Sequence, residues 1–101
     1  MTRSHTDQDP AVLVELEGGI PEPVADYARA KIGQLTRYAH RPVLLIKVRL
    51  TRVAHRADAK ISAQAIVDIN GHPLVSHAVG TTGQEAVDLL QAKLRNQLGH
   101  L

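Results

Sequence analysis

The chain has 101 residues, of which 44% are apolar and 22% charged, a composition typical of one small globular domain rather than a disordered tail. It contains no Cys, Phe or Trp, which excludes disulfides, thiolate zinc sites and cysteine nucleophiles and requires a largely aliphatic core. Twelve Lys and Arg against ten Asp and Glu leave a net charge of +2, too small by itself to argue for a nucleic-acid partner.

Residues 1–10 are polar and end at Pro10, which predicts a flexible N-terminal arm before a single domain over residues 11–101. The arm has no apolar run of the kind that a signal peptide needs, and no stretch of the chain approaches the ~18 apolar residues of a membrane span. Together with the absence of cysteine, these features predict a cytoplasmic protein without a membrane partner.

The first two predicted elements are a strand and a helix. Residues 11–17 alternate between two sets of side chains, one of which includes Glu15 and Glu17, so they predict a strand with one polar-leaning face. After Pro23 the apolar period becomes helical, and proline is tolerated in a first helical turn. The apolar stripe of this helix comprises Val24, Ala28, Ile32, Leu35 and Ala39. It predicts one helix that continues until His40-Arg41-Pro42.

Cations occupy the exposed side of this helix. Arg29, Gly33 and Arg37 recur at i, i+4 and i+8, which places them on one outward face. Lys31 lies at the edge of the apolar stripe, where its stem can pack while the ammonium reaches solvent. Arg41 follows the last turn, where the negative end of the helix dipole favours a cation.

Three strands are predicted in the middle of the chain. Residues 43–52 alternate between an apolar face and a cationic face, comprising Leu44, Ile46, Val48 and Leu50 against Lys47, Arg49 and Thr51. Residues 53–58 predict a polar, basic loop, and residues 59–70 alternate again. Asn70-Gly71 predicts a hairpin turn, because a type I′ turn needs a positive φ at both central positions. Residues 72–79 form the returning strand, and Pro73 favours an edge position for it.

A second helix is predicted at the end of the chain. Thr82 and Glu85 are spaced as a capping box, and the apolar stripe that follows comprises Val87, Leu90, Leu94, Leu98 and Leu101. Lys93 and Arg95 flank that stripe on opposite sides. The order β-α-β-β-β-α predicts an α+β two-layer sandwich, in which both helices cover one face of a four-stranded sheet. The first strand is expected to join the second in parallel through the first helix.

Residue patterns that would carry catalysis are missing from the sequence. No two of the six histidines are spaced i, i+4, and His72 and His77 are expected on opposite faces of one strand. No serine lies in a GxSxG turn, and Gly80-x-x-Gly83 lacks the lysine of a phosphate-binding loop. We therefore expect no metal site, no cofactor, no small-molecule substrate and no enzymatic activity.

Three helical segments carry a resemblance to a known family. Residues 31–38 are similar to a K-L-x-K-L-x-K-Y segment, and residues 85–90 and 93–98 to A-I-D and K-L-x-x-Q-L segments. In this order and spacing they resemble the N-terminal domain of the ribosome hibernation promoting factors, also known as the ribosome-associated inhibitor A or protein Y family. One departure is that Thr82-Gly83-Gln84 stands where the family has Asp-x-Tyr.

The resemblance implies a domain that binds the small ribosomal subunit and its rRNA in the tRNA and mRNA channel. Such a domain silences translation under stress or in stationary phase. The cations that match those of the family by position are Lys31, Arg37, Lys93 and Arg95, and periodicity and helix-end placement add Arg29 and Arg41 to the expected rRNA-binding set. Family members often carry a C-terminal dimerising domain, so dimerisation is expected only through such a domain, which lies outside this sequence.

Two other functions remain open on the sequence. One is binding of structured RNA without preference for the ribosome, since the fold order also resembles that of double-stranded-RNA-binding domains, which recognise shape and backbone. Base-stacking recognition is disfavoured because only Tyr27 and Tyr38 are aromatic. The other is a protein-interaction module in which the open edge strand over residues 72–79 pairs with a partner strand.

Overall fold

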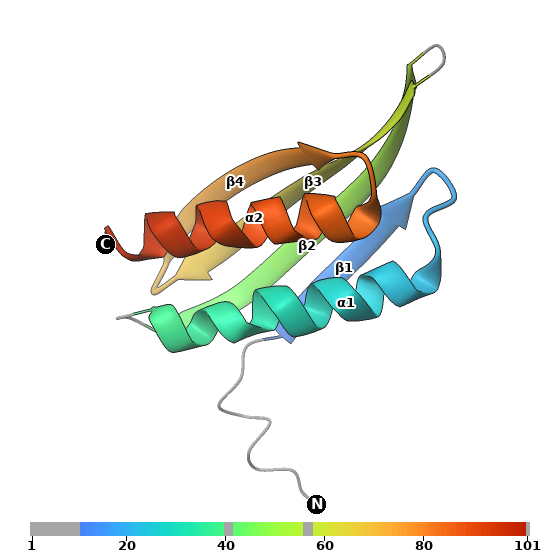
Figure 1. Cartoon of the computed structure of the whole chain (residues 1–101). Helices are drawn as coiled ribbons and strands as arrows, with labels where there is room; N and C mark the ends of the chain where they lie inside the picture. The colour runs from blue at the N-terminus through green and yellow to red at the C-terminus, as the bar shows by residue number, and fades with distance from the viewer. Residues whose placement is uncertain (1–10, 40–41, 56–57, 101) are drawn as a thin grey trace, which may run out of the picture.

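The computed structural model describes residues 11–39, 42–55 and 58–100 and confirms the predicted α+β sandwich. The elements are β1 (Ala11–Glu17), α1 (Glu22–Gly33), the 3₁₀ helix η2 (Gln34–Tyr38), β2 (Val43–His55), β3 (Asp58–Ile69), β4 (His72–Gly80) and α2 (Gly83–Leu98). The sheet has the order β1-β2-β3-β4, with β1 parallel to β2 and the other neighbours antiparallel. Both helices lie side by side across one face of this sheet (Figure 1). The predicted arm over residues 1–10 and the last stripe position, Leu101, lie outside the described residues.

The core lies between the helices and the sheet and is built from aliphatic side chains. The helices bury their predicted stripes, including Ile32 and Leu35 from the first helical segment and Leu90, Leu94 and Leu98 from α2. The strands contribute the alternate positions Ile46, Val48 and Leu50 from β2 and Ala63, Ala65 and Val67 from β3. The small alanines of β3 allow the helices to approach the sheet closely, so a dense core forms without Phe or Trp.

The hairpin of β2 and β3 is longer than the sequence predicted. The loop expected over residues 53–58 is wrong at residues 53–55 and 58, which lie in strands, and its residues 56–57 lie outside the described residues. Val53 lies opposite Lys60, and the ladder continues until His55 lies opposite Asp58. This part of the hairpin extends beyond the helices (Figure 1). Polar side chains are tolerated there because the ladder is held by backbone hydrogen bonds and has no core to cover. Their polarity is therefore no evidence for a loop.

The first helix does not continue in α-geometry until residue 39, as its apolar stripe predicted. The α-helix ends at Gly33, and η2 follows as a tighter 3₁₀ segment. The Thr36 hydroxyl donates to the Gly33 carbonyl (3.3 Å), and Pro42 disfavours helical geometry in the residue before it. Leu35 is still only 1% exposed, so the stripe predicted burial correctly but not the change of helix type.

Leu44 is not a core residue, in contrast to the prediction from the alternation of residues 43–52. Its side chain is 56% exposed. Val43 pairs with Ile69 and Leu45 pairs with Asp68, so the register shifts between the two pairs and leaves Leu44 as the extra residue of a β-bulge. The alternation predicted for Ile46 and the residues that follow it is unaffected.

Two glycines serve purposes that other residues could not. Asn70 (φ 53°) and Gly71 (φ 89°) confirm the predicted hairpin turn, and the Gly71 N–H donates to Asp68 Oδ1 (2.8 Å). Gly80 ends β4 where α2 crosses it closely. A Cβ at Gly80 would lie 2.6 Å from the backbone nitrogen of Ala86, so any larger residue would push the helix away from the strand.

Replacement of Leu94 by alanine tests the core assignment. Leu94 is 0% exposed, so Leu94→Ala should lower the free energy of unfolding by about 2–5 kcal/mol, through lost burial and the cavity that remains. Leu89, on the same helix, is 44% exposed, and Leu89→Ala should cost less than about 1 kcal/mol. Urea denaturation of both variants checks the difference, and equal losses would contradict the assigned face of α2.

Candidate nucleic-acid interface

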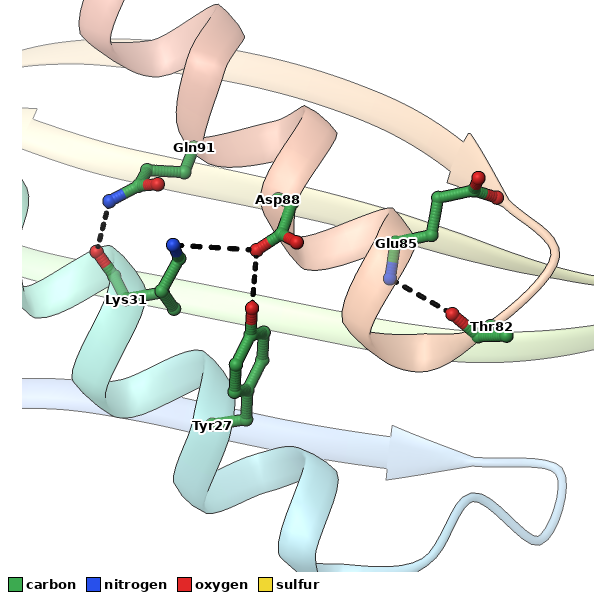
Figure 2. A network of polar contacts seen from close by, with 6 residues as sticks. All are labelled: Tyr27, Lys31, Thr82, Glu85, Asp88 and Gln91. Atoms are coloured by element: carbon green, nitrogen blue, oxygen red, sulfur yellow. Dashed lines mark hydrogen bonds and ion pairs between the residues drawn. The ribbon is translucent and has the colours of Figure 1, made fainter.

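A polar cluster joins the two helices where they lie side by side (Figure 2). The Tyr27 hydroxyl donates to Asp88 Oδ1 (2.6 Å), and Lys31 Nζ lies 3.6 Å from the same oxygen. Gln91 Nε2 donates to the backbone carbonyl of Lys31 (2.9 Å). The hydrogen bond to Asp88 raises the pKa of Tyr27, with smaller contributions from burial and from the carboxylate charge. The cluster fixes α2 relative to α1, and the sequence pattern did not reveal it.

Lys31 is therefore less available to an external partner than Arg29 or Arg37. Its side chain is 33% exposed, and besides the ion pair with Asp88 its ammonium lies 5.9 Å from the centre of the Tyr27 ring. The prediction that its stem packs at the core edge agrees with this placement. An RNA phosphate that approached Lys31 would have to compete with the carboxylate of Asp88.

Arg29 and Arg37 lie together on the side of the first helical segment that faces β1. Both line a surface groove whose other members include Val12 of β1 and Gly33 of α1. Arg29 pairs with Asp26 (2.8 Å), whose side chain is 80% exposed, so this pair is a weak surface interaction. Arg37 is exposed and makes no hydrogen bond or ion pair within the described residues. The structure thus brings these two predicted cations to one flank of the helix layer.

Lys93 lies on the opposite flank, where α2 borders β4. Its Nζ donates to the backbone carbonyl of His77 (2.7 Å), and Gln97 Nε2 donates to the carbonyl of Val75 (3.5 Å). Lys93 and Gln97 are the polar residues of the K-L-x-x-Q-L segment, and its two leucines are buried in the core. This segment therefore attaches α2 to the edge strand, in addition to any contact that Lys93 makes with RNA.

The last two predicted cations differ in how they are placed. Arg95 is exposed on α2 and lines a shallow hollow together with Gln91, Asn96 and His100. Arg41 lies outside the described residues. The helix-layer cations hence form no single cluster, since Arg29 and Arg37 lie on the β1 flank and Lys93 on the β4 flank.

The sheet face opposite the helices is uncovered and of mixed character. Arg49 pairs across β1 and β2 with Glu15 (3.2 Å), and Thr51 donates to Glu17 (3.2 Å). Lys47 is exposed and makes no hydrogen bond or ion pair within the described residues. The cross-strand row that contains it is otherwise aliphatic, comprising Leu13, Ile66 and Val75, which are 42–52% exposed. This face is thus less cationic than the alternation of residues 43–52 suggested.

The N-terminus of α2 confirms half of the predicted capping box. The Glu85 N–H donates to Thr82 Oγ1 (3.0 Å), as Figure 2 shows. The Glu85 carboxylate accepts from the N–H (2.6 Å) and hydroxyl (3.0 Å) of Thr81, one residue earlier than the box requires. Thr82 stands where the resembled family has Asp, and both residues are good N-caps, so this departure preserves the helix start.

Within the ranges that the structure describes, no three His, Asp or Glu side chains gather in a way that could hold a metal ion. None of the described helices is long and apolar enough to cross a membrane.

Comparison with known proteins identifies the fold. No protein-family model matches the chain, and a search of curated proteins finds no match. Among solved structures, the protein Y N-terminal domain of Thermus thermophilus superimposes with a TM-score of 0.70 at 21% identity, covering 91% of this chain and 97% of that one. The fold is that of the protein Y N-terminal domain. A ribosomal subunit interface protein from Coxiella burnetii also matches, with a TM-score of 0.66 at 20% identity, covering 88% and 93% of the two chains.

The Thr81–Glu85 contact predicts how the stability of this protein Y fold depends on pH. Hydrogen bonds from Thr81, with the charge of Lys60, lower the pKa of Glu85 from its ordinary 4.5. A carboxyl group whose pKa is lower in the folded chain stabilises the fold above the unfolded pKa, and this contribution is lost as the pH falls through the folded pKa. Glu85→Gln should therefore reduce the loss of unfolding free energy between about pH 7 and about pH 3.

Urea denaturation at the two pH values measures this effect. Glu22→Gln is the matched control, because Glu22 lies in the first turn of α1 and makes no hydrogen bond within the described residues. A Glu85→Gln variant with the same pH dependence as the parent protein would show that the Thr81 contact does not persist in solution.

Proposed function

We propose that this domain belongs to the ribosome hibernation factor family, binds the small ribosomal subunit in the tRNA and mRNA channel and silences translation without catalysing a reaction. The fold match carries the proposal, since it spans nearly the whole of both chains and the matched proteins are named as protein Y and as a ribosomal subunit interface protein. The helix segments that resemble the family in sequence also support it. A cytoplasmic location follows from a ribosomal partner.

The chemistry of the helix layer suits contact with RNA phosphates. Arg37 is exposed and has no partner among the described residues, and Arg29 has only a weak surface partner to give up. Guanidinium groups bind phosphate through two parallel hydrogen bonds, so two arginines on one flank can hold a strand of RNA in register. Such contacts fix position without reading bases, which suits a partner recognised by its shape.

The contacts within the protein rank the predicted cations. Arg37 and Arg29 should contribute most to binding, and Arg95 and Arg41 belong to the same proposed rRNA-binding set. Lys31 should contribute least, since its ammonium is paired with Asp88. Lys93 should make an intermediate contribution to binding, because its ammonium has three N–H donors and the His77 carbonyl uses one of them.

Cosedimentation with small ribosomal subunits over a salt series tests the proposal. Arg37→Glu should weaken binding, and loss of one phosphate contact should flatten the slope of log K against log salt by about 0.7–0.9. Lys47→Glu is the matched control, because Lys47 likewise has no partner in the described part of the chain but lies on the open sheet face. It should leave binding nearly unchanged.

The same assay separates the proposal from general RNA binding. An excess of duplex RNA should compete poorly for the protein if the subunit is the specific partner, and addition of the protein should inhibit translation in an extract. Strong competition by the duplex would favour a general structured-RNA binder. Loss of binding on Lys47→Glu with no effect of Arg37→Glu would show that the sheet face and not the helix layer meets the ribosome.

A further inference from the structure

The two edges of the sheet differ in whether their outer backbone groups are occupied. An edge strand presents a row of N–H and C=O groups that no neighbouring strand uses. On β4, Lys93 and Gln97 donate to the carbonyls of His77 and Val75, so α2 covers part of this edge. On β1, no group outside the sheet bonds to the backbone of residues 12–17 within the described part of the chain. The edge expected to be open from the sequence, residues 72–79, is therefore the more protected one.

A cationic groove runs beside the open edge. It lies between β1 and the first helical segment, with Val12, Gly33 and Gln34 among its lining and with Arg29 and Arg37 beside them. A Cβ placed on Gly33 would be 3.8 Å from Val12 Cγ2, so helix and strand pass close to each other here. Two guanidinium groups thus stand next to an unpaired strand edge.

The spacing of the two arginines matches the repeat of an extended chain. The chain rises through four residue steps of α-helix and four of 3₁₀ helix from Arg29 to Arg37, which corresponds to about 14 Å along the helix axis. In an extended segment, residues i and i+4 lie on the same face about 13 Å apart. Carboxylates at those two positions could therefore meet both guanidinium groups at once. The side chains at i+1 and i+3 would face the open side of the sheet, next to Leu13, which is 51% exposed.

We propose that the β1 edge and the Arg29–Arg37 groove together bind an extended segment of a partner protein. The segment adds to the sheet as a fifth strand, with acidic residues at i and i+4 toward the helix and aliphatic residues toward the open face. Backbone hydrogen bonds supply affinity, and the two arginines select an acidic strand. RNA phosphates do not continue a β-ladder, so the backbone edge itself fits a peptide, whereas the two arginines can bind either a carboxylate or an RNA phosphate. This interaction goes beyond binding to the ribosome and does not require it.

A synthetic peptide and NMR spectroscopy test the proposal on the full chain. The probe is the capped peptide Ac-Glu-Val-Thr-Val-Glu-Val-NH2, titrated into the ¹⁵N-labelled protein. We expect saturable shifts of the amides of residues 12–17, larger than any in residues 72–80. Arg29→Glu combined with Arg37→Glu should weaken binding at least about tenfold, as should replacement of both peptide glutamates by lysine. Lys47→Glu is the control variant and should bind as the parent protein does.

Backbone methylation of the peptide separates strand addition from attraction between charges. In a β-ladder only every second N–H of the added strand faces its neighbour. Of two peptides N-methylated at alternate positions, one should lose binding at least about tenfold, whereas the other should retain it. Equal binding of both, shifts centred on β4, or no saturable shift up to about 1 mM peptide would overturn the proposal. So would a short RNA duplex that shifts the amides of residues 12–17 more strongly than the peptide.

Discussion

The burial of two aliphatic helix stripes against the same face of one sheet is the constraint on which the rest of this structure depends. The chain has no disulfide and no large aromatic residue besides two tyrosines, so this interface supplies nearly all of its apolar burial. Because both helices pack against one face of the sheet, the other face stays uncovered. The cations of the helices are then directed outward, toward the two sheet edges or, as with Lys31, into the contact between the helices. The placement of the candidate binding residues that the structure describes follows from this arrangement.

Cations that look equivalent on a helical wheel differ strongly in what surrounds them. Lys31 points into the contact between the helices and meets Asp88, whereas Arg37 is exposed and bonds to none of the residues that the structure describes. Lys93 reaches across to the backbone of β4. A positive charge at a sheet edge or helix contact is thus used partly to hold the elements together. The number of cationic side chains in a small domain is therefore larger than the number that are available to bind a phosphate.

The residues in the segments that resemble the hibernation factors have roles within the fold itself, in addition to any role in binding. In K-L-x-x-Q-L the leucines fill the core, and the lysine and glutamine occupy edge carbonyls of β4. Thr82 preserves a helix cap where the family has Asp. Similarity in these segments is accordingly stronger evidence for the architecture than for a particular binding surface.

The sequence by itself determined the order of the elements, the hairpin turn at Asn70-Gly71, the cap at Thr82 and the core-facing sides of both helices. These features depend on residues within one or two turns of one another, so local periodicity and turn chemistry are sufficient to predict them. Tertiary structure alone decided the features that depend on partners distant in the chain. The bulge at Leu44 arises from the pairing of β2 with β3. The extension of β2 beyond residue 52 arises from backbone hydrogen bonds, which form whether the side chains are polar or apolar. Lys31 is paired because a carboxylate on the other helix lies beside it. Periodicity shows which side of an element a residue lies on, but only the packed fold determines what it meets there.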